Sequence, residues 1–343
     1  MTTTTLTDLG WSAHFDRQLN PETVGEPARV SAIHRDRLEA LTPGGTLDLI
    51  SALPMSDLAV GDWVLQDGTH VLQRLAPRGE LLRRAAGGTR HQQRIAANVD
   101  VLGIVTSCNA DFKPARIERY LALAATAGAL PLVILTKADL AEDVTTFRRA
   151  AERLSPLLAA VALDARDPEA VKILAPWCGT GQTLALLGSS GVGKTTLRNS
   201  LTGEAEATAT IREDDAKGRH TTTSRALRQV ANGGWLIDTP GMRELGLTDA
   251  ADGIDTVFDD LSSLASQCRF ADCQHEGEPG CAIAAAIAAG HVEPDRLDRW
   301  QRLRREDRFN SESAAETRAR HRSRQKMYNQ GKRRGLSKRD WGD

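Results

Sequence analysis

Hydrophobic and polar positions follow different periods in successive parts of the chain, beginning with short extended runs. Residues 1–25 hold isolated apolar residues without a period, which predicts a flexible leader over 1–27. Between 28 and 86, short apolar runs are broken by turn signals such as Gly44-Gly45 and Asp67-Gly68. Regularly spaced short strands of this kind predict a small β-barrel. The polar stretch that follows, up to Arg94, is expected to be a linker.

The middle of the chain alternates strand-like runs with helix-like runs, and this alternation predicts a parallel α/β sheet within 95–250. Past Gly241 the strand pattern stops, and a mostly helical unit is expected over 251–317. The predicted strands are 99–106, 130–135, 159–163 and 183–187, and the predicted helices are 115–127, 142–154 and 168–174.

Composition excludes several classes of protein. The 343 residues carry 44 Lys and Arg against 45 Asp and Glu, so a net charge of −1 gives no overall basic field for coating nucleic acid. Positive charge gathers instead in a tail, 318–343, with ten Lys and Arg and two Asp. No apolar run has the ~20 residues of a membrane span, and no secretory signal begins the chain. We therefore expect a cytoplasmic protein without a membrane partner.

A glycine-rich string fits the phosphate-binding pattern G-x-x-x-x-G-K-[ST] between an apolar strand and a helical run. Its glycines let backbone N–H groups turn toward a β-phosphate, and the start of the helix adds its positive end. Lys194 is expected to reach the β- and γ-phosphates, and Thr195 to ligate Mg²⁺. A Gly/Ser-rich turn that matches by chance is the alternative. The predicted phosphate-binding residues are Gly188, Ser189, Ser190, Gly191, Val192, Gly193, Lys194, Thr195 and Thr196.

Two further motifs stand at the ends of predicted strands. The string D-T-P-G at 238–241 has the form D-x-x-G, which would place Asp238 near the Mg²⁺ ion and the Gly241 amide near a γ-phosphate. The string T-K-A-D at 136–139 is similar to the guanine-reading motif N-K-x-D, whose carboxylate accepts from guanine N1–H and the 2-amino group. Ordinary polar loops are the alternative for both strings. The predicted base-binding residues are Thr136, Lys137, Ala138 and Asp139.

The first residue of the guanine-reading string departs from the usual pattern. Thr136 stands where the motif has Asn, and this replacement removes an amide that normally braces the loop. The sequence therefore supports a guanine site less strongly than it supports the phosphate site. A base-flanking motif is less evident, and Leu163-Asp164-Ala165 is the nearest candidate.

Three of the five cysteines crowd together beside a histidine. Cys268, Cys273, His275 and Cys281 provide four soft or borderline ligands within fourteen residues. Such a set suits a closed tetrahedral Zn²⁺ site of Cys₃His type, which would be structural because no position is left open. Free thiols scattered by chance are the alternative. Cys108 and Cys178 are expected to be small buried residues.

The order of the motifs is informative. In ordinary GTPases the phosphate loop comes first and the base-reading motif last, whereas here Asp139 precedes Lys194, which precedes Asp238. This permuted order, the upstream barrel and the downstream Cys/His cluster together resemble the bacterial ribosome small-subunit-dependent GTPase A family. The resemblance covers roughly 28–309, and it includes the string I-A-A-N-V-D at 95–100 and a G-R-H-T-T-T string at 218–223.

The resemblance implies a fold and a mechanism of hydrolysis. The fold would be an N-terminal barrel of the oligonucleotide-binding (OB) type, a central circularly permuted P-loop GTPase domain and a C-terminal helical zinc-binding domain with the basic tail. The 218–223 string resembles the first switch, where Thr222 would close over Mg²⁺. Met242 occupies the usual position of the water-orienting Gln, so His220 is the candidate for that role. Hydrolysis is expected to be slow until a partner accelerates it.

The resemblance also implies the partner, which is 16S rRNA in the small (30S) ribosomal subunit during late maturation. The basic tail would contact RNA phosphates, although a solvated charge run is its alternative interpretation. We expect a monomer that binds GTP and GDP. A GTP-sensing RNA-binding module with incidental hydrolysis is a second hypothesis. An ATP-dependent P-loop enzyme is a third, which Asp139 disfavours.

Overall fold

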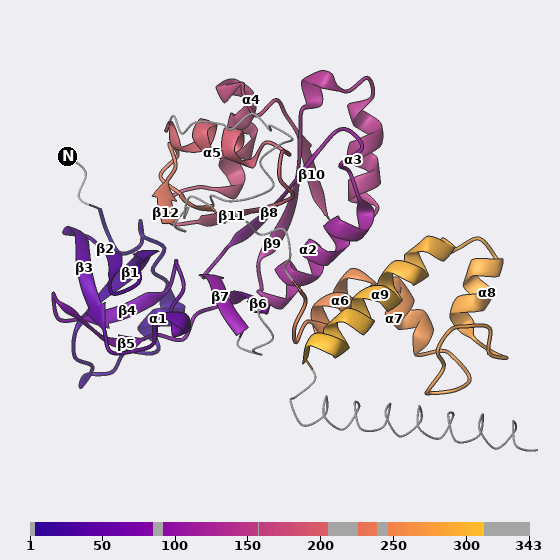
Figure 1. Ribbon diagram of the computed structural model, residues 1–343, viewed down its shortest axis with the longest axis horizontal. Coiled ribbons are helices and arrows are strands. Elements are labelled where there is room, and N and C mark those ends of the chain that lie inside the picture. The colour runs from indigo at the N-terminus through magenta and orange to yellow at the C-terminus, as the bar shows by residue number, and fades with distance from the viewer. Residues whose placement is uncertain (1–3, 85–91, 157, 205–225, 239–245, 312–343) are drawn as a thin grey trace, which may run out of the picture.

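The computed structural model describes residues 4–84, 92–156, 158–204, 226–238 and 246–311. Figure 1 shows a small barrel at the N-terminus, a central sheet with helices against it, and a helical unit at the C-terminal side. The expected division into a barrel, an α/β domain and helices is confirmed. Among the described residues, no helix combines the length and apolar character that crossing a membrane requires.

The barrel consists of five strands whose pairing returns to its starting point. The order β1-β2-β3-β5-β4 closes because β4 also pairs with β1. Its interior is filled by small and branched apolar side chains such as Val30, Leu49 and Val64. This is the five-stranded closure of an OB-type barrel. The strands are β1 (Glu26–Ile33), β2 (Leu38–Thr42), β3 (Gly45–Ser51), β4 (Trp63–Gln66) and β5 (His70–Arg74), with a 3-10 turn at Met55–Asp57.

The central sheet contains five parallel strands in the order β10-β9-β8-β11-β13. A further strand, β12, runs antiparallel to β13 and pairs with β1 at Ala32 and Ala226, which joins the sheet to the barrel. All seven residues of β8 are buried, as expected for a strand covered on both faces. The strands are β8 (Val101–Ser107), β9 (Leu130–Thr136), β10 (Ala159–Ala162), β11 (Thr183–Leu187), β12 (Ala226–Gln229) and β13 (Trp235–Asp238).

The helices of the central unit lie near the expected positions. The predicted helix at 168–174 is divided into α4 and a 3-10 helix, Lys172–Trp177, because Pro176 cannot supply an N–H to a continuous α-helix. The α-helices are α2 (Pro114–Thr126), α3 (Val144–Glu152), α4 (Pro168–Val171) and α5 (Lys194–Thr202).

The C-terminal unit packs on α2, and buried charges lie at this contact. The helices are α6 (Ala251–Val257), α7 (Asp259–Ala265), α8 (Ala282–Ala288) and α9 (Pro294–Ser311). The Glu118 carboxylate on α2 is fully buried and accepts from Arg299 at 2.7 Å and Arg296 at 3.3 Å, both on α9. Burial raises the pKa of Glu118, and the two arginines oppose that rise. Arg296 also pairs with Asp260 of α7 at 2.7 Å.

The expectation of a loose leader is wrong for residues 6–19, whose apolar side chains pack against the core. Phe15, in the short helix α1 (Ala13–Asp16), and Leu9 are buried, and the Trp11 and Trp63 rings meet edge to face at 4.8 Å. The buried Arg29 of β1 donates to the Leu9 carbonyl and to Thr183 Oγ1, both at 2.6 Å. The segment packs through individual side chains and not through one face of a helix or strand. Its packing therefore leaves no hydrophobic period in the sequence.

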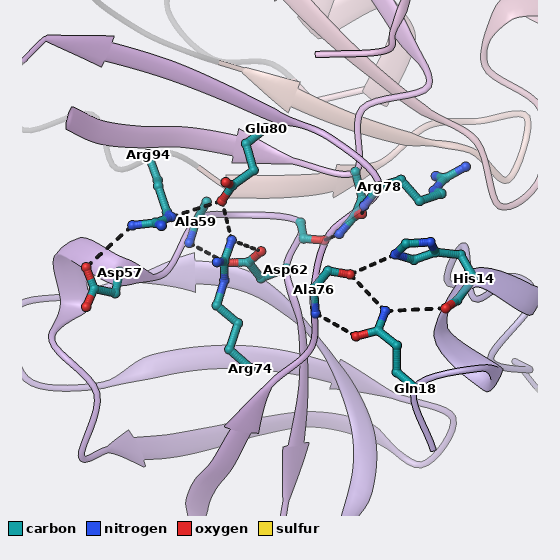
Figure 2. A network of polar contacts seen from close by, with 12 residues as sticks. His14, Gln18, Asp57, Ala59, Asp62, Arg74, Ala76, Arg78, Glu80 and Arg94 are labelled. Carbon is teal, nitrogen blue, oxygen red and sulfur yellow. Dashed lines mark hydrogen bonds and ion pairs between the residues drawn. The ribbon is translucent and has the colours of Figure 1, made fainter. Parts of the chain in front are cut away.

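The expected linker also contains a strand. Strand β7 (Gln92–Ala97) pairs with β6 (Glu80–Arg84) in a separate two-stranded sheet. Figure 2 shows that Arg94 and Arg74 both reach Glu80 and that Arg74 also pairs with the buried Asp62 of the barrel. The distance between the Arg74 guanidinium and the Asp62 carboxylate is 2.9 Å. These ion pairs fasten the hairpin to the barrel.

Glu118→Gln tests the junction between α2 and the helical unit. The substitution leaves Arg299 without a buried anionic partner, so we expect the free energy of unfolding to fall by about 3 kcal/mol. Urea denaturation followed by circular dichroism measures the loss. The control is Glu169→Gln, which removes an exposed ion pair with Lys172 and should change stability by less than about 0.5 kcal/mol. Equal stabilities of the two variants would contradict a stabilising role of Glu118 at this junction.

Candidate functional site

The predicted phosphate loop joins β11 to α5 and is held close to the sheet. A Cβ on Gly188 would lie 2.2 Å from the Val105 carbonyl oxygen, so only glycine fits this approach to β8. Gly191 and Gly193 have φ values of 80° and 94°, in the left-handed region that favours glycine. Lys194, Thr195 and Thr196 begin α5, so the loop leads directly into the positive end of this helix. The geometry is that of a phosphate-binding loop.

The side chains of the loop make contacts that the motif itself did not predict. Lys194 Nζ donates to the carbonyl oxygens of Gly188 at 2.7 Å and Ser189 at 2.5 Å. The Ser189 hydroxyl donates to the Asp111 carboxylate at 2.9 Å and accepts from Arg116 of α2. Arg116 also pairs with Asp111 at 2.9 Å. The loop is thereby tied to the start of α2, a contact without any signal in the local sequence.

Thr136 contacts the phosphate loop through its own hydroxyl. Thr136 is buried at the end of β9, and its hydroxyl lies 2.5 Å from the carbonyl oxygen of Val192 in the phosphate loop. The carbonyl oxygen of Thr106 lies 3.2 Å away as a second acceptor. A hydroxyl on the last residue of β9 reaches the loop because β9 and β11 both flank β8. The base-reading and phosphate-binding segments are therefore directly connected.

The remaining base-reading residues lie beside the candidate base-flanking loop. Ala138 N–H donates to the Leu163 carbonyl at 3.4 Å, and Ser200 of α5 donates to the Ala165 carbonyl at 2.7 Å. The Asp139 carboxylate accepts from Arg166 at 2.6 Å, an arginine that also pairs with Asp164. Arg166 is 67% exposed on its side chain, so a ligand can displace it from Asp139. No motif predicts a role for this arginine, although it directly follows the candidate flanking string.

Asp238 lies at the end of β13, level with Leu186 of β11. Its carboxylate accepts from Arg198 at 2.8 Å, and Arg198 is itself buried on α5. Because Arg198 stands four residues after Lys194, the two side chains share one side of α5. Gly241, Met242, His220, Thr222 and the basic tail 318–343 lie outside the described residues.

The chain just after the D-x-x-G motif is held by the last turns of α9. Four hydrogen bonds connect side chains of the helix to the backbone of residues 247–250. They join Glu306 to Leu247 N–H at 3.3 Å, Asp307 to Ala250 N–H at 2.9 Å, Asn310 to the Leu247 carbonyl at 2.7 Å, and Ser311 to Asp249 N–H at 2.8 Å. The helical unit thereby holds the backbone of residues 247–250 in place.

The four predicted metal ligands converge between α7 and α8. Their ligand atoms all lie within 4.8 Å of one another. Cys268 Sγ and Cys281 Sγ are 4.0 Å apart, and each lies 3.6 Å from His275 Nδ1. Ligand separations of about 3.5–3.8 Å follow from tetrahedral Zn²⁺ with its usual bond lengths. Cys273 completes the set, so the cluster fits one zinc ion of Cys₃His type. Cys108 and Cys178 are buried elsewhere, as expected.

A phosphate loop on β11, a base-reading segment on the earlier strand β9 and a D-x-x-G aspartate on the later strand β13 define a circularly permuted P-loop GTPase. The family model for the RsgA GTPase matches residues 75–248. The chain is 52% identical over 315 residues to a small ribosomal subunit biogenesis GTPase RsgA of Mesorhizobium japonicum, covering 89% of this chain and 91% of that protein. It belongs to the RsgA GTPase family.

Other relatives agree with this placement. A protein named small ribosomal subunit biogenesis GTPase RsgA 2, from Vibrio vulnificus, is 45% identical and covers 94% of each chain. The crystal structure of YjeQ from Thermotoga maritima superposes with a TM-score of 0.60 at 22% identity, covering 81% of this chain and 96% of that one. The structure of YloQ, described as a circularly permuted GTPase, gives a TM-score of 0.58 at 19% identity, covering 86% and 99%. The solved structures support the fold.

Thr136→Val tests the brace between β9 and the phosphate loop. The valine keeps the shape but removes the hydroxyl, leaving the buried Val192 carbonyl without this donor. We expect GDP affinity to fall about tenfold, which corresponds to about 1.4 kcal/mol, and Thr136→Ser to retain it. Calorimetric titration measures both variants against Thr145→Val, an exposed control on α3. If Thr136→Val binds GDP as tightly as Thr145→Val, the brace is dispensable.

Cys273→Ser tests the metal cluster. We expect purified wild-type protein to contain one zinc ion per chain and the variant to lose it, because three ligands no longer close the tetrahedron. The region after about Asp260 should then become sensitive to proteolysis, while the central domain still binds GDP. Cys178→Ala, buried against the sheet, is the control that keeps its zinc. A wild-type protein free of zinc by metal analysis would refute the assignment.

Proposed function

We propose that this chain binds the small (30S) ribosomal subunit and hydrolyses GTP to GDP and phosphate during late maturation of the subunit, with hydrolysis stimulated by it. The observation that carries the proposal is the meeting of three separate motifs at one edge of the sheet, in a chain 52% identical to a small ribosomal subunit biogenesis GTPase. We infer that the protein works as a cytoplasmic monomer.

The described residues support a division of roles in the nucleotide site. The loop 188–193 and the start of α5 would hold the phosphates, and Asp139 would select guanine after Arg166 moves aside. Bound GTP would draw Lys194 Nζ from two carbonyl oxygens to charged phosphate oxygens, which are stronger acceptors. Thr195 would ligate Mg²⁺, and Asp238 would face its coordination sphere. The magnesium ion would neutralise charge on the phosphates.

The water-orienting group would come from outside the phosphate loop. Met242 cannot orient a water by hydrogen bonding, so His220 is proposed for this role and Thr222 for closing over Mg²⁺, with the Gly241 amide at the γ-phosphate. Hydrolysis by the free enzyme would be slow, and binding to the subunit would raise the rate.

The surface beside the metal cluster supports 16S rRNA as the contacted component. A cavity of about 310 Å³ between the cluster loop and α9 is lined by Arg304, Arg305 and Arg308 together with Phe270. Phe270 is 44% exposed, and the Arg269 guanidinium lies 5.4 Å from the centre of its ring. Aromatic faces beside arginines are suited to unpaired bases and phosphates. The basic tail would add further phosphate contacts.

The experiment is phosphate release from GTP and ATP, with and without purified small subunits. We expect GTP to be preferred, and hydrolysis to be slow alone and raised at least tenfold by the small subunit. Lys194→Ala should abolish turnover because it removes charge stabilisation of the transferred phosphate. Lys172→Ala, an exposed lysine on the 3-10 helix, is the control.

The same assay separates the alternatives. His220→Ala should lower stimulated turnover more than it lowers binding to the subunit. An identical rate with and without small subunits would favour a GTP-sensing RNA-binding module, in which hydrolysis is incidental. A preference for ATP would overturn the guanine assignment.

A further inference from the structure

A second cavity lies between α2, the phosphate loop and α9, apart from the cluster loop. Its volume is about 650 Å³, enough for a group larger than a single phosphate. Ser189 and Ser190 of the phosphate loop line one wall, and Tyr120 and Leu303 line another. The cavity therefore lies where the nucleotide-binding domain meets the helical unit, and apart from Ser189 and Ser190 its lining residues belong neither to the motifs nor to the metal cluster.

Five basic side chains line this cavity: Lys113, Arg116, Arg119, Arg299 and Arg302. Three of them have acidic partners outside the lining. Arg116 pairs with Asp111, Arg119 with Glu306 and Arg299 with Glu118. Lys113 and Arg302 are exposed, and within the described ranges neither forms an ion pair. Two positive charges are thus left uncompensated in a protein whose net charge is −1.

The start of α2 adds to this positive potential. Lys113 is the N-cap residue of this 13-residue helix, its side chain makes no capping bond, and the first turn contains no acidic residue. Within the helix no carboxylate of the first turn offsets its positive end, and the nearest one, Asp111 before the N-cap, is already paired with Arg116. Ala115, in the same turn, also lines the cavity. Ammonium, guanidinium and helix amide groups are all donors, and phosphate oxygens accept from all three.

We propose that this cavity binds backbone phosphates of RNA, with Lys113 and Arg302 as the contacting cations. The inference rests on the proposed function, which identifies the RNA as that of the small ribosomal subunit. Phosphodiester groups fit because the site offers donors and positive charge in a volume that admits more than one phosphate. The electrostatic footprint is local, since the overall charge gives no general attraction to RNA.

Arg116 connects the cavity to the phosphate loop, so binding in the cavity can affect the nucleotide site. Its guanidinium contacts both Asp111 and the hydroxyl of Ser189 in the phosphate loop. A phosphate in the cavity would compete with Asp111 for this guanidinium and so change the contacts of Ser189. Occupation of the cavity by RNA would then act on the first residues of the loop.

The test is the double substitution Lys113→Gln and Arg302→Gln in the full-length chain. Binding to small subunits is measured with a non-hydrolysable GTP analogue at several KCl concentrations. We expect affinity at 100 mM salt to fall about tenfold and the slope of log affinity against log salt to shrink by about 1.5–2, one phosphate contact per cation. Basal GTP hydrolysis without subunits should stay unchanged.

Two controls isolate the cavity. Arg153→Gln removes an exposed arginine that does not line the cavity and should leave both affinity and slope unchanged. The double variant Lys113→Arg and Arg302→Lys keeps both positive charges and should bind like the wild type. This result would show that the loss in the glutamine variant reflects charge and not misfolding. Thermal melting confirms that all variants are folded.

Equal subunit binding by the wild type and the double glutamine variant would overturn the inference while leaving the proposed function intact. Absence of subunit binding by the wild type would instead contradict the proposed function. It would also contradict the small subunit as the source of the RNA. A variant that loses affinity for free GTP but not for the subunit would also overturn the inference, because the cavity would then belong to the nucleotide site.

Discussion

The parallel pairing of β11 with β8 on one side and β13 on the other is the constraint on which the candidate site depends. Leu187 is level with Ile104 of β8, and Leu186 is level with Asp238 of β13. The carboxyl ends of these strands therefore lie along one edge of the sheet, where ligands of open α/β folds bind. β9, on the other side of β8, ends at the same edge with Thr136. Motifs separated by about fifty residues of chain become neighbours only through this strand order.

Buried charges connect this sheet to the other two units. Arg29 reaches from the barrel to Thr183 at the start of β11, and burial lowers its pKa to about 10. Glu118 connects α2 to α9 through two arginines. A charge removed from water needs its partners in place, so each contact disfavours alternative arrangements of the units. The contacts between the units thus include buried ion pairs and hydrogen bonds of fixed geometry in addition to apolar packing.

The C-terminal unit contacts the central domain at two places. At α2, Arg119 pairs with Glu306, and Arg116 of the same helix contacts the phosphate loop. At residues 247–250, side chains of α9 hold the backbone. The first of these contacts joins the helical unit to an element that touches the candidate site. This arrangement suits an enzyme whose hydrolysis depends on what it binds.

Local pattern in the sequence predicts the elements and the chemistry that are encoded by residues close together in the chain. The parallel strands of the sheet, the phosphate loop, the metal ligands and the permuted order follow from periodicity and spacing for this reason. The packing of residues 6–19, the brace from Thr136 to Val192 and the pairing of Arg166 with Asp139 are visible only in the folded chain. These contacts join segments through single side chains, and a single side chain leaves no period or spacing to detect. The Thr136 hydroxyl reaches Val192 because the strand order brings this acceptor close, and a motif comparison contains no information about that distance.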